Sequence, residues 1–328
     1  VRRLVAIAIA ALAALALAPL APAATMGTYH IAVEAPLTGP QGASGMDMLR
    51  GARLAVREIN LAGGVLGMQW RIDGYDDKAD ATTGTDVAKR ILASHVNAMI
   101  GPYNSSVGVK TLPGLVKGGV FPVQLTSTDD TSGLGATVQP KNSQISPAEV
   151  DWMKAKKVGK VTILWDPSTY TKGMADRMYK ALDDMGVLVT KIKIDPAATD
   201  YTAVVAQALT NNPDTVYVST YFPQGALIAQ ALAAAAAAGN DARCFMGLAN
   251  QDPAFVTASG AAAAHRCTFS GSPTPAQFGN AQSKAYVKAY KALYGKDPGT
   301  WGIYYYDSVK LLAASIAAAG TTERDEAE

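Results

Sequence analysis

Hydroxyl and amide side chains gather in three short loops of this sequence. One is a glycine-rich run at residues 38–45, and the other two follow short apolar runs that end near residues 100 and 123. Exposed amides and hydroxyls at the start of a helix favour an anionic group. Each loop alone also fits a plain helix cap or turn, but three loops at one sheet edge predict a polar ligand pocket. The candidate ligand-binding residues in these loops are Ser44, Tyr103, Asn104, Ser105, Ser106, Thr126, Ser127 and Thr128.

Aromatic side chains mark the second half of the chain. Tyr170 and Tyr221 each follow a predicted strand, where a ring can close over a ligand and offer its hydroxyl; core packing is the alternative for each. The run of three tyrosines at 304–306 falls at a helix start. Because successive helix residues point ~100° apart, one or two of the three at most can face a cleft. We select Tyr305 as the candidate.

The sequence offers little material for catalysis or metal binding. It contains no G-x-S-x-G, H-E-x-x-H or G-x-x-x-x-G-K-[ST] motif, and its only histidines are His30, His95 and His265. The glycines at 39, 42 and 45 are spaced differently from those of a dinucleotide loop, and Pro40 removes one amide. We therefore expect no enzyme, no cofactor and no metal. An α/β hydrolase with a triad assembled from distant residues stays an alternative.

Composition and the first residues indicate an exported globular protein. The 328 residues are 49% hydrophobic and 17% charged, with a net charge of +2, which argues against disorder and against a nucleic-acid partner. Arg2 and Arg3 precede an apolar run at 4–17 and a small-residue site at 21–23. This pattern is typical of a signal peptide over residues 1–23, cleaved near Ala23. The apolar run is shorter than the ~20 residues that a membrane anchor needs.

Export places the two cysteines in an oxidising compartment. Cys244 and Cys267 each lie in a short apolar run. If those runs are neighbouring parallel strands, a disulfide between them is geometrically possible. We predict the bridge; two buried thiols are the alternative.

Predicted strands and helices alternate along the mature chain, which indicates βαβ units and parallel sheets. Strands are predicted at 29–35, 68–75, 97–100, 120–123, 160–165, 187–194, 215–218, 242–246 and 267–270. Helices are predicted at 45–62, 82–94, 105–117, 170–185, 201–211, 225–238, 281–294 and 302–319. Breaks at 131–146 and 271–275 divide this rhythm into two blocks, and residues 321–328 form a charged tail that we expect to fray. The expected fold is α/β, with two Rossmann-like lobes and a ligand cleft between them.

Several segments resemble one family of binding proteins. They are residues 35–40 (APLTGP), 51–60 (GARLAVREIN), 63–67 (GGVLG), 75–77 (YDD), 100–106 (IGPYNSS) and 306–312 (YDSVKLL). Together they resemble periplasmic binding proteins of the branched-chain amino acid type, the substrate-binding components of ABC transporters. The resemblance spans residues 29–320, and the part through Asp77 is the most specific.

The resemblance implies a type I periplasmic binding fold. One lobe would comprise residues 24–138 and 275–320, and the other residues 139–274. It implies that Ser105 and its loop, with the hydroxyls and amides of Thr126, Ser127 and Thr128, hold a ligand carboxylate. Tyr170 and Tyr221 would line the second lobe, and Ser44 stands where some relatives carry an aromatic residue.

Two departures from the family pattern are visible. Relatives that bind amino acids usually place a carboxylate opposite the ligand's ammonium, just after the strand at 245–247. Here Ala249 and Asn250 stand nearest to that place, and Asp252 would serve only if its loop folds inward. We retain Asn250 as a candidate. The chain also stops soon after Ala319, where relatives continue with another crossing segment.

The leading prediction is therefore a periplasmic, monomeric protein that binds a small carboxylate-bearing solute, with amino acids first. It would deliver the solute to a membrane permease of an ABC transporter. The alternatives are an exported ligand-sensing receptor domain of the same fold and, less favoured, the hydrolase.

Overall fold

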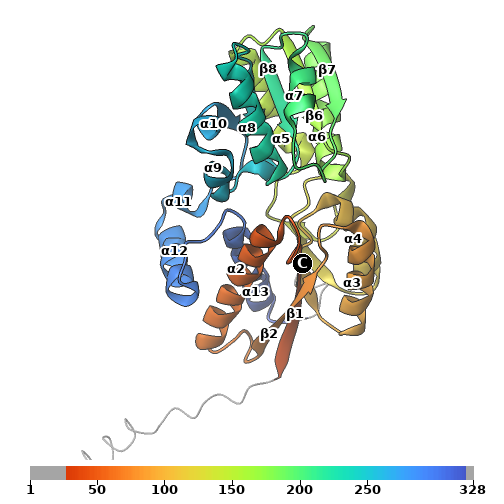
Figure 1. The fold of residues 1–328 in the computed structure, drawn as a ribbon. Helices are drawn as coiled ribbons and strands as arrows, with labels where there is room; N and C mark the ends of the chain where they lie inside the picture. Colours follow the sequence, from red (N-terminus) through yellow and green to blue (C-terminus); the bar gives the residue numbers. More distant parts are fainter. Residues whose placement is uncertain (1–26, 323–328) are drawn as a thin grey trace, which may run out of the picture.

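The computed structural model describes residues 27–322 and consists of two α/β lobes, each built on a sheet of parallel strands (Figure 1). The expected signal peptide and its cleavage site, and most of the charged tail, lie outside this range. Each lobe has one five-stranded sheet in which every pair of neighbouring strands is parallel. The predicted fold class is confirmed.

The first lobe has the strand order β2-β1-β3-β4-β5. Its strands are β1 (Thr28–Ala35), β2 (Gln69–Asp76), β3 (Ala98–Ile100), β4 (Phe121–Gln124) and β5 (Ala136–Thr137). Its helices are α2 (Gly42–Leu61), α3 (Ala81–Ala93), α4 (Ser105–Lys117), α12 (Ala281–Tyr294) and α13 (Gly302–Ala319), with a 3-10 turn η1 (Asp129–Thr131).

The second lobe has the strand order β10-β9-β8-β6-β7. Its strands are β6 (Lys160–Trp165), β7 (Leu188–Lys193), β8 (Thr215–Ser219), β9 (Arg243–Met246) and β10 (Cys267–Phe269). Its helices are α5 (Asn142–Ala155), α6 (Thr169–Asp184), α7 (Thr202–Leu209), α8 (Gln224–Ala237), α9 (Ala254–Ser259) and α10 (Ala261–His265), with a 3-10 turn η2 (Leu248–Asn250). The short helix α11 (Pro275–Phe278) leads back to the first lobe.

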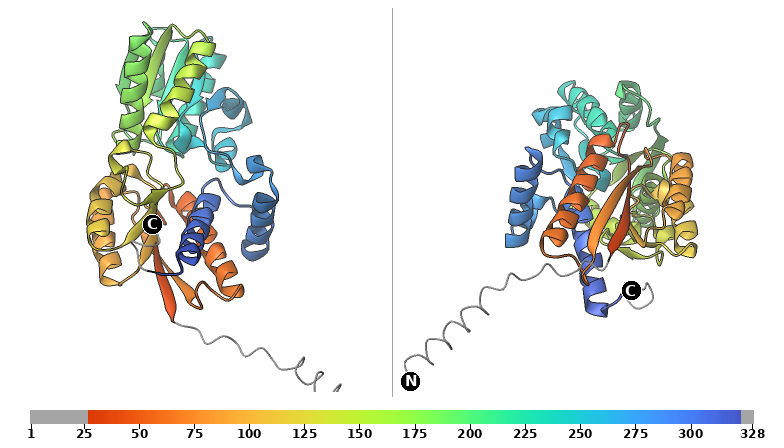
Figure 2. Two further views of the ribbon diagram at one scale, coloured as in Figure 1. Left: turned by 180° about the vertical axis from the view of Figure 1, so that it is seen from behind. Right: turned by 90° about the horizontal axis from the view of Figure 1, so that it is seen from below.

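Segments far apart in sequence build the first lobe. Helix α13 lies beside α2 in both Figure 1 and the left view of Figure 2. A Cβ atom on Gly51 would stand 1.9 Å from the carbonyl oxygen of Gly302, so only glycine allows the two helices to approach this closely. The carboxylate of Asp47 in α2 accepts hydrogen bonds from the backbone N–H groups of Gly299 (2.9 Å) and Gly302 (2.6 Å) at the start of α13. This contact fixes the end of α13 that faces the other lobe.

The predicted break at 131–146 is shorter than expected. Helix α5 begins at Asn142, and η1 and β5 also fall inside the break. The Gln144 side chain accepts from the backbone N–H of Lys141, which caps the first turn of α5. Pro147 lies inside this helix, near its beginning, and does not end it. Helices α9 and α10 were also missed, because residues 254–265 are short alanine-rich stretches without a clear period.

The two cysteines lie opposite each other on neighbouring parallel strands, Cys267 of β10 and Cys244 of β9. Their sulfur atoms form a disulfide in the structure. Within residues 27–322, no helix has both the length and the apolar character needed to cross a membrane.

Candidate functional site

The two lobes touch through polar side chains at the carboxyl ends of their strands. Ser106 Oγ, in the first turn of α4, accepts from the backbone N–H of Thr169 (2.9 Å) at the start of α6 and donates to Thr169 Oγ1 (3.2 Å). Ser44 Oγ donates to Asp252 Oδ2 across the cleft (3.1 Å). The Arg177 guanidinium pairs with Asp129 (2.8 Å) nearer the first crossing. These contacts hold the lobes together over the site.

Two of the predicted loops meet in the first lobe. The backbone N–H of Thr128 donates to Ser105 Oγ (3.2 Å), and both side chains are buried. Ser105 is the first residue of α4, and Thr128 follows β4. The start of α4 brings unpaired backbone amides to the same place. Ser105 and Thr128 therefore form a small polar patch with a partial positive charge.

Thr126 and Ser127 have their hydrogen-bond partners elsewhere, in the segment of residues 131–141 that leads from the first lobe to the second. Thr126 Oγ1 lies 2.5 Å from Thr131 Oγ1, and Lys141 Nζ donates to the Thr126 carbonyl (2.9 Å). Ser127 Oγ accepts from Gln139 Nε2 (3.2 Å). Burial lowers the pKa of Lys141 to about 8, since neutral oxygens surround its ammonium group. Thr126 and Ser127 therefore connect the loop after β4 to the segment that leads to the second lobe.

Four aromatic rings from both lobes gather between the sheets. Tyr103 lies edge-on to Tyr221 across the cleft, with ring centres 6.0 Å apart, and Tyr221 lies edge-on to Tyr170 (5.6 Å). Trp301 packs on Tyr103 (5.1 Å) from the first lobe. All four rings are at most 8% exposed. Burial is the main cause that raises the pKa of Tyr103, Tyr170 and Tyr221, so all three stay neutral at physiological pH.

Trp301 was missed from the sequence. It stands directly before α13, as the N-cap residue of this helix. Tyr305 is placed differently from the prediction: it is fully buried in the first lobe and donates to the Glu34 carbonyl (3.0 Å) at the end of β1. For Trp301, the signal in the sequence was a large aromatic residue at the last position before the predicted helix at 302–319.

Asn250 holds two loops of the second lobe together. Its Nδ2 donates to the Thr220 carbonyl (2.8 Å), and its Oδ1 lies so close to Gly225 that a Cβ atom there would meet it at 1.8 Å. Asp252, two residues further, does fold inward, as its contact with Ser44 shows. The carboxylate in this loop that reaches the opposite lobe is therefore that of Asp252.

A cavity of about 460 Å³ lies between the lobes. Its lining combines Gln41, Lys78, Asn104 and Ser106 with Asp166, Ser168, Thr220, Tyr221 and Gln224. Asn104 is 3% exposed; its Nδ2 donates to Gln41 Oε1 (3.0 Å), while its Oδ1 has no hydrogen-bond partner. A polar group of this kind at a cavity wall is available to a ligand.

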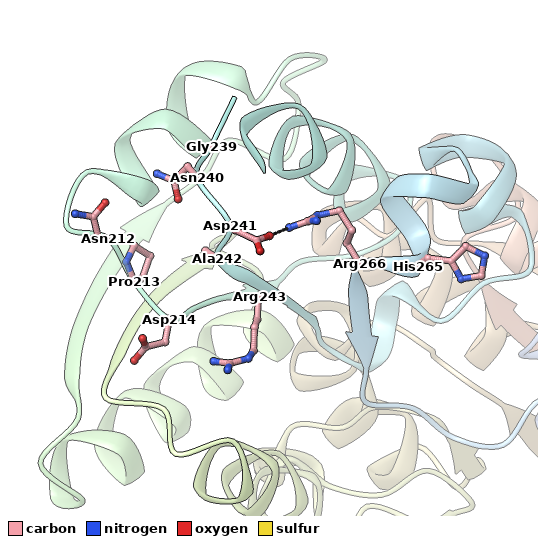
Figure 3. Close-up of a pocket in the computed structure, with 10 residues that line it drawn as sticks. All are labelled: Asn212, Pro213, Asp214, Gly239, Asn240, Asp241, Ala242, Arg243, His265 and Arg266. Carbon is pink, nitrogen blue, oxygen red and sulfur yellow. Dashed lines mark hydrogen bonds and ion pairs between the residues drawn. The ribbon is translucent and has the colours of Figure 1, made fainter. Parts of the chain in front are cut away.

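A larger cavity of about 730 Å³ lies at the far end of the second lobe (Figure 3). Its lining residues precede β8, β9 and β10, so it sits at the amino ends of these strands. In sheets of this kind ligands bind at the carboxyl ends. We therefore place the functional site in the cleft, although its cavity is smaller.

Comparison with known proteins agrees with this geometry. A family model described as "periplasmic binding protein" matches residues 28–327. The chain belongs to the periplasmic binding protein family. The resemblance seen in the sequence is confirmed, and family membership implies an extracytoplasmic location.

Individual relatives of this periplasmic binding protein are also named as solute-binding proteins. The Leu/Ile/Val-binding protein BraC3 of Rhizobium johnstonii is 30% identical over 308 residues, which cover 90% of this chain and 81% of the relative. The branched-chain amino acid transporter substrate-binding protein LivJ of Streptococcus pneumoniae, solved with isoleucine, has a TM-score of 0.79 and 25% identity, covering 92% of this chain and 87% of LivJ. A solute-binding protein of an ABC transporter from R. palustris, solved with benzoate, has a TM-score of 0.78 and 19% identity, covering 92% and 84% of the two chains. These relatives are solute-binding proteins, which favours a binding role over an enzymatic one.

Proposed function

We propose that this protein captures a small solute bearing a carboxylate between its two lobes and delivers it to the membrane permease of an ABC transporter. The observation that carries the proposal is the patch formed by Ser105 and Thr128 at the start of α4. Backbone amides and hydroxyls at a helix start bind an anion without a lysine or arginine. Relatives named for Leu, Ile and Val, and a structural neighbour solved with benzoate, all have carboxylate ligands.

Lobe closure explains how such a patch would become selective. The bonds from Ser106 to Thr169 and from Ser44 to Asp252 join opposite walls of the cleft. They form only when the lobes are together, so a solute that bridges the walls stabilises the closed state. Closing also removes water, which strengthens each hydrogen bond to the solute.

A thermal-shift panel of amino acids, aliphatic acids, aromatic acids and their amides tests the proposal. A ligand at 100 times its dissociation constant stabilises the folded state by about 2.7 kcal/mol. Ser105→Ala should weaken the best acid by roughly 1–3 kcal/mol, because a hydrogen bond to a charged group is lost. Ser132→Ala, which removes an exposed hydroxyl of the same lobe, is the matched control and should bind normally.

Stabilisation by the amides alone, or normal binding of acids to Ser105→Ala, would contradict the carboxylate assignment. Delivery is tested separately, by adding the solute-loaded protein to the permease and measuring stimulation of its ATPase activity. A transporter that is not stimulated would favour the sensing role.

A further inference from the structure

A further cavity lies in the second lobe, between helix α5 and the sheet. Its volume is about 310 Å³, at the lower end of the roughly 300–1,000 Å³ that small-molecule sites occupy. One wall is a single face of α5, with Ile145, Glu149 and Trp152 three or four positions apart, and the opposite wall comes from β9, η2 and β10. None of its lining residues lines the cleft cavity. We call this cavity the α5 pocket.

A buried carboxyl group lines the α5 pocket and lacks a partner on one oxygen. Glu149 is 1% exposed, and its Oε2 accepts from the Tyr217 hydroxyl (2.7 Å). Its Oε1 has no hydrogen-bond partner, and the Ser270 hydroxyl close by forms no hydrogen bond to either oxygen. Because nearly all buried polar atoms in folded proteins are hydrogen-bonded, an acceptor left free at a cavity wall indicates a donor that comes with a ligand.

The charge on this carboxyl group is also uncompensated. Burial raises the pKa of Glu149 to about 7, against the smaller effects of the Ser270 and Tyr217 hydroxyls, so the group is about half ionised at neutral pH. Within residues 27–322 no lysine, arginine or histidine forms an ion pair with it. Burial also raises the pKa of Tyr217 and Tyr170, which stay neutral beside it. A buried carboxylate of this kind is stabilised by a cation that hydrogen-bonds to it.

Aromatic rings line much of the rest of the α5 pocket. Trp152 and Phe245 lie with ring centres 4.8 Å apart, and Phe269 adds a third ring from β10. The outer face of Trp152 carries Lys156 Nζ, 5.9 Å from the ring centre, and Lys156 itself does not line the pocket. Apolar walls favour a ligand that brings an apolar body, and the small volume restricts that body to one ring with a short chain.

We propose that the α5 pocket binds a small organic cation of the arylalkylamine class, whose ammonium group donates to Glu149 Oε1 and whose ring packs against Trp152, Phe245 and Phe269. The pocket also touches Pro140 and Gly271, in the two segments that connect the lobes. This second site is separate from the cleft, so the inference goes beyond the proposed function and does not rest on it.

Three probes separate the charge from the ring. Phenethylamine carries both, phenethyl alcohol keeps the ring and a donor without the charge, and ethylamine keeps the ammonium group without the ring. Titration calorimetry with the full chain at about pH 8, where Glu149 is ionised, should show that phenethylamine binds about tenfold more tightly than either of the other two.

Variants assign the binding to the α5 pocket. Glu149→Gln keeps the shape and an acceptor for the Tyr217 hydroxyl, and it should lower the affinity for phenethylamine about tenfold with little change for the alcohol. Ala148→Phe fills the pocket from an exposed position of its rim and should abolish binding of the amine. Ala155→Phe, at an exposed position of α5 outside the lining, is the matched control and should bind as the wild type does.

The pH profile gives a readout that a purely structural role of Glu149 would not move. Phenethylamine stays protonated from about pH 6 to about pH 8, whereas Glu149 loses its proton over this range. The affinity of the wild type should therefore rise about tenfold, and that of Glu149→Gln should stay constant. If Glu149→Gln does not fold, Ala148→Phe and the wild-type profile still decide the question.

Absence of phenethylamine binding, or equal binding by the wild type and a folded Ala148→Phe variant, would overturn the inference. Phenethyl alcohol that binds as tightly as the amine would overturn the choice of a cation. Each of these results leaves the proposed function standing, because that function is tested with acids and Ser105→Ala in the cleft.

Discussion

The cleft and the cavity at the far end of the second lobe differ in how they are built. The far cavity is the larger, about 730 Å³ against 460 Å³, but one lobe supplies all its lining residues. Three of its charged side chains already have partners: Arg266 pairs with Asp241, and Asp214 accepts from the backbone N–H groups of Gly159 and Lys160. In the cleft, both lobes contribute, and the buried Asn104 Oδ1 has no partner. Polar groups that converge on one cavity from both lobes are a better sign of a site than volume alone.

The largest expected contrast between the two regions concerns pH. Behind the cleft, Asp77 is fully buried, and burial raises its pKa to about 7. Between pH 4 and 7 the folded protein holds a proton that the unfolded chain has released, so stability falls as pH rises through this window and levels off above it. Three pKa units correspond to roughly 4 kcal/mol, an upper bound for this single group.

Asp77→Asn should reduce that dependence, because the amide stays neutral at every pH. Burial also raises the pKa of Glu149 to about 7 and that of Glu34 well above its usual value, so these two groups keep part of the slope. Asp241→Asn, in the far cavity, is the matched control and should keep the wild-type slope. Urea unfolding at several pH values measures both. Equal slopes for the two variants would show that Asp77 is not the group responsible.

The second contrast concerns the disulfide, which lies in the strands next to the far cavity. Cys244 and Cys267 are 23 positions apart, and loss of the bridge should lower the free energy of unfolding by about 3 kcal/mol in the loop-entropy model. The Cys244→Ala, Cys267→Ala double variant should nevertheless bind the solute normally at saturation. Thiol titration of the unreduced, denatured protein should find no free thiol; two would refute the bridge.

Much of this architecture could be predicted from the sequence, because strands and helices alternate with clear periods. The direction of individual side chains could not. Thr126 and Ser127 stand in a correctly placed loop, yet they contact the crossing segment, whose helix α5 was not foreseen. Trp301 lies in the cleft because Asp47, remote in sequence, fixes the start of α13. Such contacts depend on tertiary packing that no local pattern encodes.

The third contrast concerns closure. Ser106→Ala removes a contact between the lobes, and it should weaken solute binding by about 1 kcal/mol with little change in stability. We predict that the lobes close around the breaks at 131–146 and 271–275, so small-angle scattering of the wild-type protein should show a smaller radius of gyration with solute. An unchanged radius at saturation would argue against hinge motion.

The smallest expected effect lies at the far cavity. Arg266 and Asp241 are 36% and 79% exposed, and exposed ion pairs contribute only about 0–1 kcal/mol to stability. Arg266→Ala should leave solute affinity unchanged, because the residue stands at the amino end of β10, and the solute is proposed to bind beyond the carboxyl ends of the strands. Calorimetry on Arg266→Ala beside Ser105→Ala makes the comparison direct. If Arg266→Ala abolished binding and Ser105→Ala did not, the larger cavity would be the solute site, and the reasoning from polar groups that converge from both lobes would fail for this fold.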